Sequence, residues 1–81
     1  MEEALRNPAK CVVGTKQVLR AVKNGRAAKV FLCKDADEFI FRQIEQACEE
    51  HKVPVILVDS MEILGKQCLI SVKTAAAAIL K

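Results

Sequence analysis

A basic row beside a single glycine is the feature of this sequence that points most directly to a binding chemistry. Lys16, Arg20 and Lys23 recur at i, i+4 and i+7 with Gln17 beside them, a spacing that places them on one side of a helix. Gly14 precedes the row, and a glycine lets another molecule approach the backbone closely. The first N–H groups of a helix also lack partners inside it. The segment therefore predicts a site for phosphates and hydrogen-bonding edges, although an ordinary solvated helix face has the same composition.

Catalytic and metal chemistry have little support in the sequence. The four cysteines are spread evenly without a Cys-x-x-Cys pair, at Cys11, Cys33, Cys48 and Cys68. A zinc site would have to gather its ligands from separate elements, so we expect the thiols to be buried as small apolar groups. His51 has no evident thiol partner, and Glu45 with Glu49 is better explained as a solvated acidic face than as a catalytic pair. We therefore expect no enzyme, no metal site, no cofactor and no small-molecule substrate.

Charge is segregated along the chain. Seven basic residues and no acidic residue lie from Lys10 to Lys34, whereas eight acidic residues lie from Asp35 to Glu62. Segregation of this kind is typical of a protein that presents one face to a polyanion. The only aromatic residues are three phenylalanines, which argues against RNA readers that stack bases on exposed sheet aromatics.

The length of 81 residues predicts one small domain, residues 1–81, with a single hydrophobic core. The amino terminus lacks the basic start and apolar run of a signal peptide, and no window reaches transmembrane length. We therefore expect a cytoplasmic protein without a membrane partner. Charges of both signs spread along one domain favour a monomer.

Strands and helices that would position the basic row alternate along the chain. We expect a short helix at Glu2–Asn7, strands at Lys10–Val13, Lys29–Cys33 and Val55–Val58, a helix ending at Asn24-Gly25, and helices at Phe39–Lys52 and Met61–Gln67. Asp37 and either Asp59 or Ser60 are the expected helix caps. The second and third strands are too uniformly apolar to be half exposed, so we expect burial on both faces and largely parallel pairs in an α/β/α sandwich. Residues 74–80 favour a helix by propensity, or a strand between closely packed helices.

Five motifs together resemble the L7Ae superfamily of kink-turn-binding ribosomal proteins, and its small bacterial members most of all. The motifs are Gly14-Thr15-Lys16-Gln17-x-x-Arg20, Lys34-Asp35-Ala36-Asp37, Val53-Pro54-Val55, Ser60-x-x-x-Leu64-Gly65 and Ile70-x-Val72-x-x-Ala75-Ala76. They cover nearly the whole chain in family order and spacing. The resemblance implies a three-layer α/β/α sandwich with a four-stranded mixed β-sheet whose last strand is the alanine-rich tail. It also implies that the opening helix contacts RNA.

The resemblance assigns roles to the residues after Gly14. In archaeal and eukaryotic members the motif is Gly-x-Asn-Glu-x-x-Lys, whose Asn and Glu read tandem sheared G·A pairs while the Lys holds phosphate. By position, Lys16 stands for the Asn, Gln17 for the Glu and Arg20 for the Lys. Gln17 can accept and donate hydrogen bonds, whereas Lys16 cannot accept. We therefore expect base contacts from Gln17, a larger phosphate share from Lys16 and Arg20, and weaker binding than in the Asn-Glu members.

A second contact implied by the resemblance is the loop before the last strand, which in the family lies against bases splayed out at the kink. Leu69 and Ile70 would cover such a base and Lys73 would meet phosphate, whereas we expect Val72 to be a core residue. The predicted RNA-binding residues are Gly14, Thr15, Lys16, Gln17, Arg20, Lys23, Lys34, Leu69, Ile70, Ser71 and Lys73.

The favoured function is thus a non-catalytic module that stabilises a kink-turn in ribosomal RNA, a riboswitch or another transcript, with the ribosome as a further partner. The alternative is a protein-interaction or ribosome-assembly module that makes its main contact through the acidic helix segment Glu45–Glu50. A small enzyme with a phosphate site at the Gly14 turn is disfavoured, because nucleotide-binding loops need several glycines.

Overall fold

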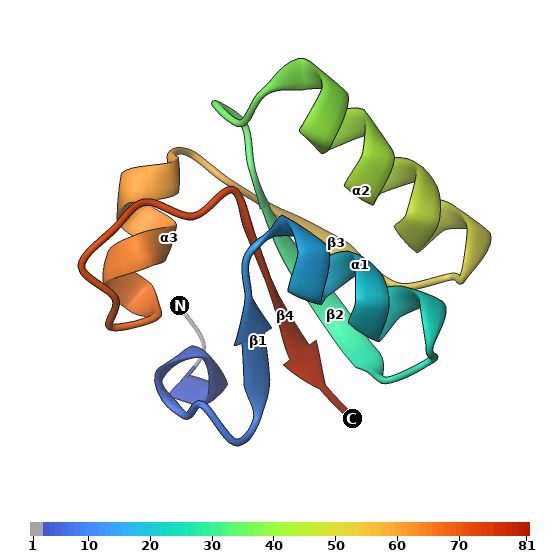
Figure 1. Cartoon of the computed structure of the whole chain (residues 1–81), viewed down its shortest axis with the longest axis horizontal. Coiled ribbons are helices and arrows are strands. Elements are labelled where there is room, and N and C mark those ends of the chain that lie inside the picture. Colours follow the sequence, from blue (N-terminus) through green and yellow to red (C-terminus); the bar gives the residue numbers. More distant parts are fainter. Residues whose placement is uncertain (1–2) are drawn as a thin grey trace.

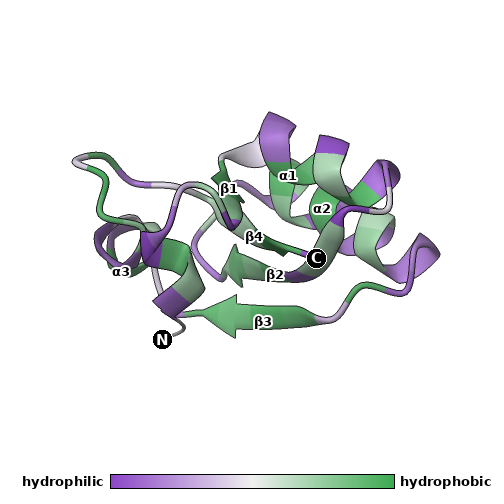
Figure 2. Cartoon of the chain, turned by 90° about the horizontal axis from the view of Figure 1, so that it is seen from below, coloured by the Kyte–Doolittle hydropathy of each residue, from purple (hydrophilic) through white to green (hydrophobic). Residues whose placement is uncertain are grey.

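A four-stranded sheet lies between two helical layers in the computed structural model, which describes residues 3–81 (Figure 1). The elements are η1 (Glu3–Arg6, a 3-10 helix), β1 (Cys11–Val13), α1 (Thr15–Lys23), β2 (Ala27–Cys33), α2 (Glu38–Glu50), β3 (Val55–Val58), α3 (Met61–Gln67) and β4 (Ala76–Leu80). Helices α1 and α2 cover one face of the sheet, and η1 and α3 pack against the other (Figure 2). The three-layer sandwich is therefore confirmed; Glu2, the expected start of the first helix, lies outside the described residues.

The sheet has the order β1-β4-β2-β3. Strand β4 runs antiparallel to both β1 and β2, and only β2 and β3 are parallel neighbours. The mixed sheet is confirmed, but the expectation of largely parallel pairs is wrong. The reason is that the tail of the chain inserts as β4 between β1 and β2, which a pattern of alternating strands and helices does not reveal.

Strand β2 connects the two cores of the molecule. Val30 and Leu32 pack into the cluster under α1 and α2, whereas Phe31 and Cys33 pack into the cluster under η1 and α3. All four side chains are buried, as alternation along a strand between two helical layers requires. The expected burial of this strand on both faces is confirmed.

Strand β3 departs from the expectation of burial. Ile56 is 39% exposed and Leu57 is 51% exposed, because β3 is an edge strand that pairs only with β2. In Figure 2, no strand or helix lies beyond β3 on the side away from β2. A continuous apolar run does not distinguish a central strand from an edge strand, so the prediction of full burial here is wrong.

The alanine-rich tail forms a strand rather than a helix. Ala76, Ala77 and Ala78 are each fully buried, and successive residues face opposite helical layers. Small side chains in a central strand allow helices to approach both faces closely, and this packing overrides the helix propensity of alanine.

Local signals at the helix ends behave as predicted. The Asp37 carboxylate accepts hydrogen bonds from the first N–H groups of α2, and the Ser60 hydroxyl oxygen accepts one from the Ile63 N–H at 3.1 Å. Helix α1 ends at Lys23 with Asn24 as its C-cap, followed by Gly25 with a φ of 71°. A left-handed residue after a helix is most easily a glycine.

The tight packing around β4 predicts the effect of enlarging one of its alanines. Replacing Ala78→Leu should lower the free energy of unfolding by about 1–3 kcal/mol, because the larger side chain cannot fit against α1 and α2 without moving them. Urea denaturation checks this, with exposed Ala9→Leu as the control, expected within about 0.5 kcal/mol of the parent chain. Equal stability of the two variants would contradict the close packing.

Candidate nucleic-acid interface

The tip of α1 is an open helix terminus built around Gly14. This N-cap residue has φ 101° and ψ 152°, a conformation that is accessible essentially only to glycine. A β-carbon added at Gly14 would contact no atom within 4 Å. The first turn has no side-chain cap and no acidic residue, so its N–H groups are left for a ligand.

The side chains around the tip divide cleanly between core and solvent. Val18 and Val22 are fully buried, whereas Lys16, Gln17 and Arg20 are exposed. Within residues 3–81, no carboxylate lies within ion-pair distance of Lys16 or Arg20. The predicted binding side chains are therefore accessible around the positive end of the helix.

The loop between α3 and β4 meets this tip at a shared carbonyl group. The Ala76 carbonyl oxygen accepts a hydrogen bond from the Gly14 N–H at 3.0 Å and another from Thr74 Oγ1 at 2.9 Å. Thr74 is buried, and its own N–H donates to the Met61 carbonyl oxygen at 3.3 Å. The loop and the α1 tip thus lie at the same end of β4, as Figure 1 shows.

The loop presents apolar side chains to solvent. Leu69 is 65% exposed and has a left-handed φ of 57°. Ile70 is half-buried, and both Ser71 and Lys73 are exposed. Val72 is 67% exposed, so the expectation that it is a core residue is wrong. Its backbone packs inward on α3 while its side chain faces out.

Gly65 explains the course of this loop. A β-carbon at Gly65 would clash with the carbonyl oxygen of Val72, so the loop can cross α3 this closely only because position 65 has no side chain. The Ile70 N–H also donates to the Gly65 carbonyl oxygen at 3.1 Å. From sequence, Gly65 is expected near the end of a helix and in a family motif, and its close contact with Val72 is not predicted, although a glycine inside a helix is itself a signal of close approach.

Lys34 lies at the same end of the sheet, where β2 ends beside β3. Its ammonium group forms an ion pair with Asp59 at 3.3 Å, and both side chains are largely exposed. Such a pair contributes about 0–1 kcal/mol, so a phosphate can compete for the lysine. The sequence alone did not reveal this partner, although parallel strands that end together place the residues that follow them side by side.

Lys23 is the predicted site residue that lies apart from the others. It occupies the last turn of α1, where it lines a shallow groove with Leu19 and with Glu50 of α2. The Gly14–Gln17 tip, Lys34 and the Thr74 end of the loop lie at one end of the sheet, with Arg20 one turn along α1. Leu69 and Ile70, at the start of the loop, line an apolar pocket with Leu5 and Cys11 on the η1 side.

The cysteines are buried, as predicted from their spacing. Burial is the main cause that raises the pKa of the Cys33 and Cys68 thiols to about 11. These thiols therefore stay protonated at neutral pH and are not activated nucleophiles.

Across residues 3–81, no three His, Cys, Asp or Glu side chains are grouped as a metal site would require. No helix in this part of the chain has the length and apolar character to cross a membrane.

The close approach at Gly65 predicts how the loop responds to a methyl group. Gly65→Ala should lower the free energy of unfolding by about 1–3 kcal/mol, because Val72 must move away from α3. Amide chemical shifts should change mainly in residues 69–73, with Ala47→Gly in α2 as a matched helix variant that leaves those shifts in place. An unchanged loop spectrum for Gly65→Ala would refute the proposed role of this glycine.

Comparison with known proteins identifies the fold and the family. The model of the Ribosomal protein L7Ae/L30e/S12e/Gadd45 family matches residues 1–81. A protein of Geobacillus kaustophilus (strain HTA426) named as an RNA-binding protein is 48% identical over 79 residues, which are 98% of this chain and 96% of that protein. The solved structure of the Giardia lamblia 15.5kD RNA binding protein matches with a TM-score of 0.84 and 31% identity, over 95% of this chain but only 65% of that one.

A solved protein of unknown function from Bacillus halodurans C shares the same fold, with a TM-score of 0.85 and 24% identity over 96% of this chain and 77% of that one. The resemblance drawn from the sequence motifs is thus confirmed by a match over the whole chain. The chain belongs to the Ribosomal protein L7Ae/L30e/S12e/Gadd45 family.

Proposed function

We propose that this chain is a monomeric cytoplasmic RNA-binding protein that grips a kink-turn, or a similar G·A-rich internal loop, and stabilises its bent form without catalysing a reaction. The observation that carries the proposal is the open glycine tip of α1, with exposed Lys16, Gln17 and Arg20 around unpaired N–H groups. The names of its relatives as RNA-binding proteins support the choice of partner.

The electrostatics of the tip favour a bent RNA over a straight one. A sharp bend brings phosphates together, and a cationic helix terminus lowers the cost of that crowding by replacing diffuse counterions. The acid-free run from Lys10 to Lys34 includes the whole tip. Each phosphate contact contributes about 0.7–0.9 to the slope of log affinity against log salt, so binding should weaken steeply with ionic strength.

Base recognition in the proposed complex falls mainly on Gln17. Its amide can accept and donate hydrogen bonds at a base edge, whereas the ammonium group of Lys16 and the guanidinium group of Arg20 only donate. Lys16 and Arg20 therefore serve phosphates, which position the RNA but carry no direct sequence information.

The conformation of Leu69 supports a contact between the loop and a splayed base. A left-handed conformation costs a non-glycine residue about 1–2 kcal/mol, and the position after a helix is one that glycine commonly occupies. The Leu69 side chain is mostly exposed, so it returns little packing energy within the chain. An apolar partner such as an unstacked base would explain why a leucine stands here.

Replacing Gln17→Ala tests the base contact. Affinity for a kink-turn RNA should fall about tenfold, since a good bidentate base contact contributes about 1–3 kcal/mol, and affinity for a plain duplex should change less than about twofold. Electrophoretic mobility shifts measure both, with exposed Gln43→Ala on α2 as the control.

The RNA control is a version of the kink-turn whose G·A pairs are made Watson–Crick. Equal losses by Gln17→Ala on the kink-turn and on the duplex would remove the base-reading role. Failure of the parent chain to distinguish the kink-turn from its Watson–Crick version would sink the proposed function, and capture of a protein instead would favour the interaction-module alternative.

Replacing Leu69→Gly should separate stability from binding. The free energy of unfolding should stay level or rise by about 1 kcal/mol, because glycine relieves the left-handed strain, while kink-turn affinity should fall several-fold. Leu69→Ala is the matched variant: it keeps the strain, loses the same apolar contact and should not gain stability. Undiminished RNA affinity in both variants would rule out a base contact at Leu69.

A further inference from the structure

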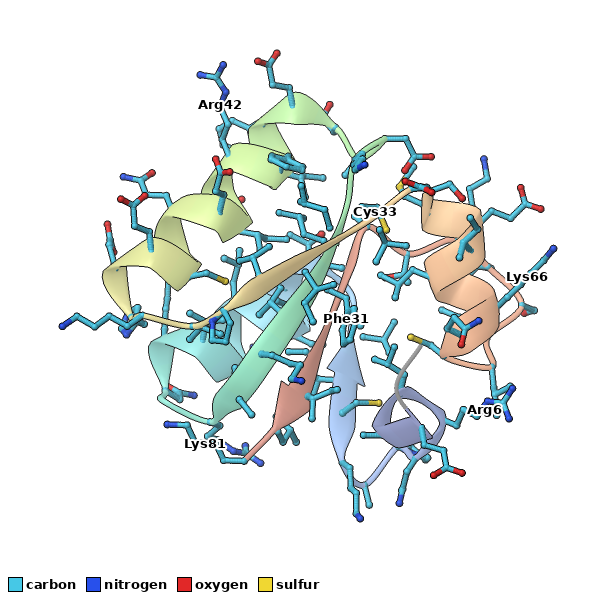
Figure 3. All side chains as sticks on the ribbon, turned by 180° about the vertical axis from the view of Figure 1, so that it is seen from behind. Arg6, Phe31, Cys33, Arg42, Lys66 and Lys81 are labelled. Atoms are coloured by element: carbon cyan, nitrogen blue, oxygen red, sulfur yellow. The ribbon has the colours of Figure 1, made fainter. Side chains whose placement is uncertain are left out.

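The end of the sheet farthest from Gly14 is ringed by cations. Every strand has an exposed basic residue next to it at this end: Lys10 before β1, Arg26 before β2, Lys52 shortly before β3 and Lys81 after β4. Figure 3 shows Lys81 at this end, away from Cys33 at the other end of β2. We call Lys10, Arg26 and Lys81 the far-end cluster.

Backbone hydrogen bonds hold the far-end cluster together. The Lys10 carbonyl oxygen accepts from the Leu80 N–H, and the Arg26 carbonyl oxygen accepts from the Lys81 N–H, both at 2.8 Å. The Arg26 N–H in turn donates to the Ala21 carbonyl oxygen at 2.9 Å. Adjacent strands lie about 4.8 Å apart, so these three cations leave the sheet from neighbouring, fixed positions.

The charge of the far-end cluster is not neutralised by the described chain. Within residues 3–81, none of its members lies within ion-pair distance of a carboxylate. Glu3 shares a shallow pocket with Lys10, and Glu50 lines the groove beside Lys23. Among the described residues, neither of these two acids forms a salt bridge with the cluster.

We propose that the far-end cluster is a second phosphate-binding surface that holds a separate RNA segment while the α1 tip holds the kink. The identity of the RNA at the tip rests on the proposed function; the cluster itself is argued from its own charge and geometry. Lysine and arginine supply only donors, and none of the exposed large apolar side chains belongs to the segments that carry the cluster. The surface therefore fits the sugar-phosphate backbone of a duplex rather than unstacked bases.

The two surfaces face opposite ends of the same strand pair. Gly14 bonds to Ala76 at the start of β4, whereas Lys10 bonds to Leu80 at its end. Ala76 and Leu80 are four residue steps apart along β4, which is roughly 14 Å at about 3.4 Å per residue. An RNA corner seated on the tip therefore leaves the far-end cluster free, and the chain would bridge two segments of one folded RNA.

The test compares two variants that each remove two positive charges. Lys10→Gln with Arg26→Gln alters the far-end cluster, and Arg42→Gln with Lys66→Gln is the matched control, since those two cations are exposed and already paired with acids on their own helices. The probes are a short kink-turn RNA and a plain RNA duplex without G·A pairs. A bridging assay asks whether chain bound to immobilised duplex captures labelled kink-turn RNA.

We expect the far-end variant to lose duplex affinity about tenfold and to lose capture in the bridging assay. Its slope of log affinity against log salt on the duplex should fall by about 1.4–1.8, which corresponds to two lost phosphate contacts. Its affinity for the kink-turn alone should stay within about threefold of the parent chain, and the control variant should resemble the parent chain in every assay.

Three results would overturn the inference. Equal losses of duplex affinity in the far-end and control variants would show an effect of net charge alone. If the far-end variant lost as much affinity for the kink-turn as for the duplex, the cluster and the tip would belong to one binding site for the same RNA. Binding of an acidic peptide in place of the duplex, with the same dependence on Lys10 and Arg26, would assign the surface to a protein. If the parent chain showed no preference for the kink-turn, the proposed function would fail, whereas the duplex measurements would still decide this inference.

Discussion

One carbonyl group fixes the relative position of the two parts of the candidate interface. The Ala76 carbonyl oxygen receives the Gly14 N–H from the α1 tip and the Thr74 hydroxyl from the loop. Ala76 opens the central strand β4, whose buried alanines let helices pack closely on both faces of the sheet. The small residues of β4 therefore set the place of the tip and the loop, although none of them is exposed to a ligand.

Features that depend on short-range chemistry could be predicted from the sequence. The amphipathic pattern of α1 and α2, the Asp37 and Ser60 caps and the glycine tip all follow from residues within a few positions of one another. The exposed row at Lys16, Gln17 and Arg20 follows from helical spacing. The alanine-rich tail had no decisive local signal, and only the family resemblance favoured a strand there.

Features that depend on which elements become neighbours could not be predicted in the same way. The apolar run of β3 has the composition of a buried strand, yet its position at the sheet edge exposes Ile56 and Leu57. Val72 has the side chain of a core residue, but the contact of its backbone with Gly65 turns it outward. The pairing of Lys34 with Asp59 required knowledge that β2 and β3 are parallel and end together.

The chemistry of the tip shifts the proposed recognition from base edges toward shape. Because the ammonium group of Lys16 only donates, Gln17 is the residue of the tip that can both accept and donate at a base, and phosphate contacts alone do not distinguish sequences. A bent RNA differs from a straight duplex in another respect: it presents crowded phosphates and an unstacked base at the same corner. The shared Ala76 carbonyl fixes a cationic helix end beside the last residues of the loop that carries the exposed Leu69. Selectivity in the proposed complex would therefore depend on this fixed geometry more than on any single base contact.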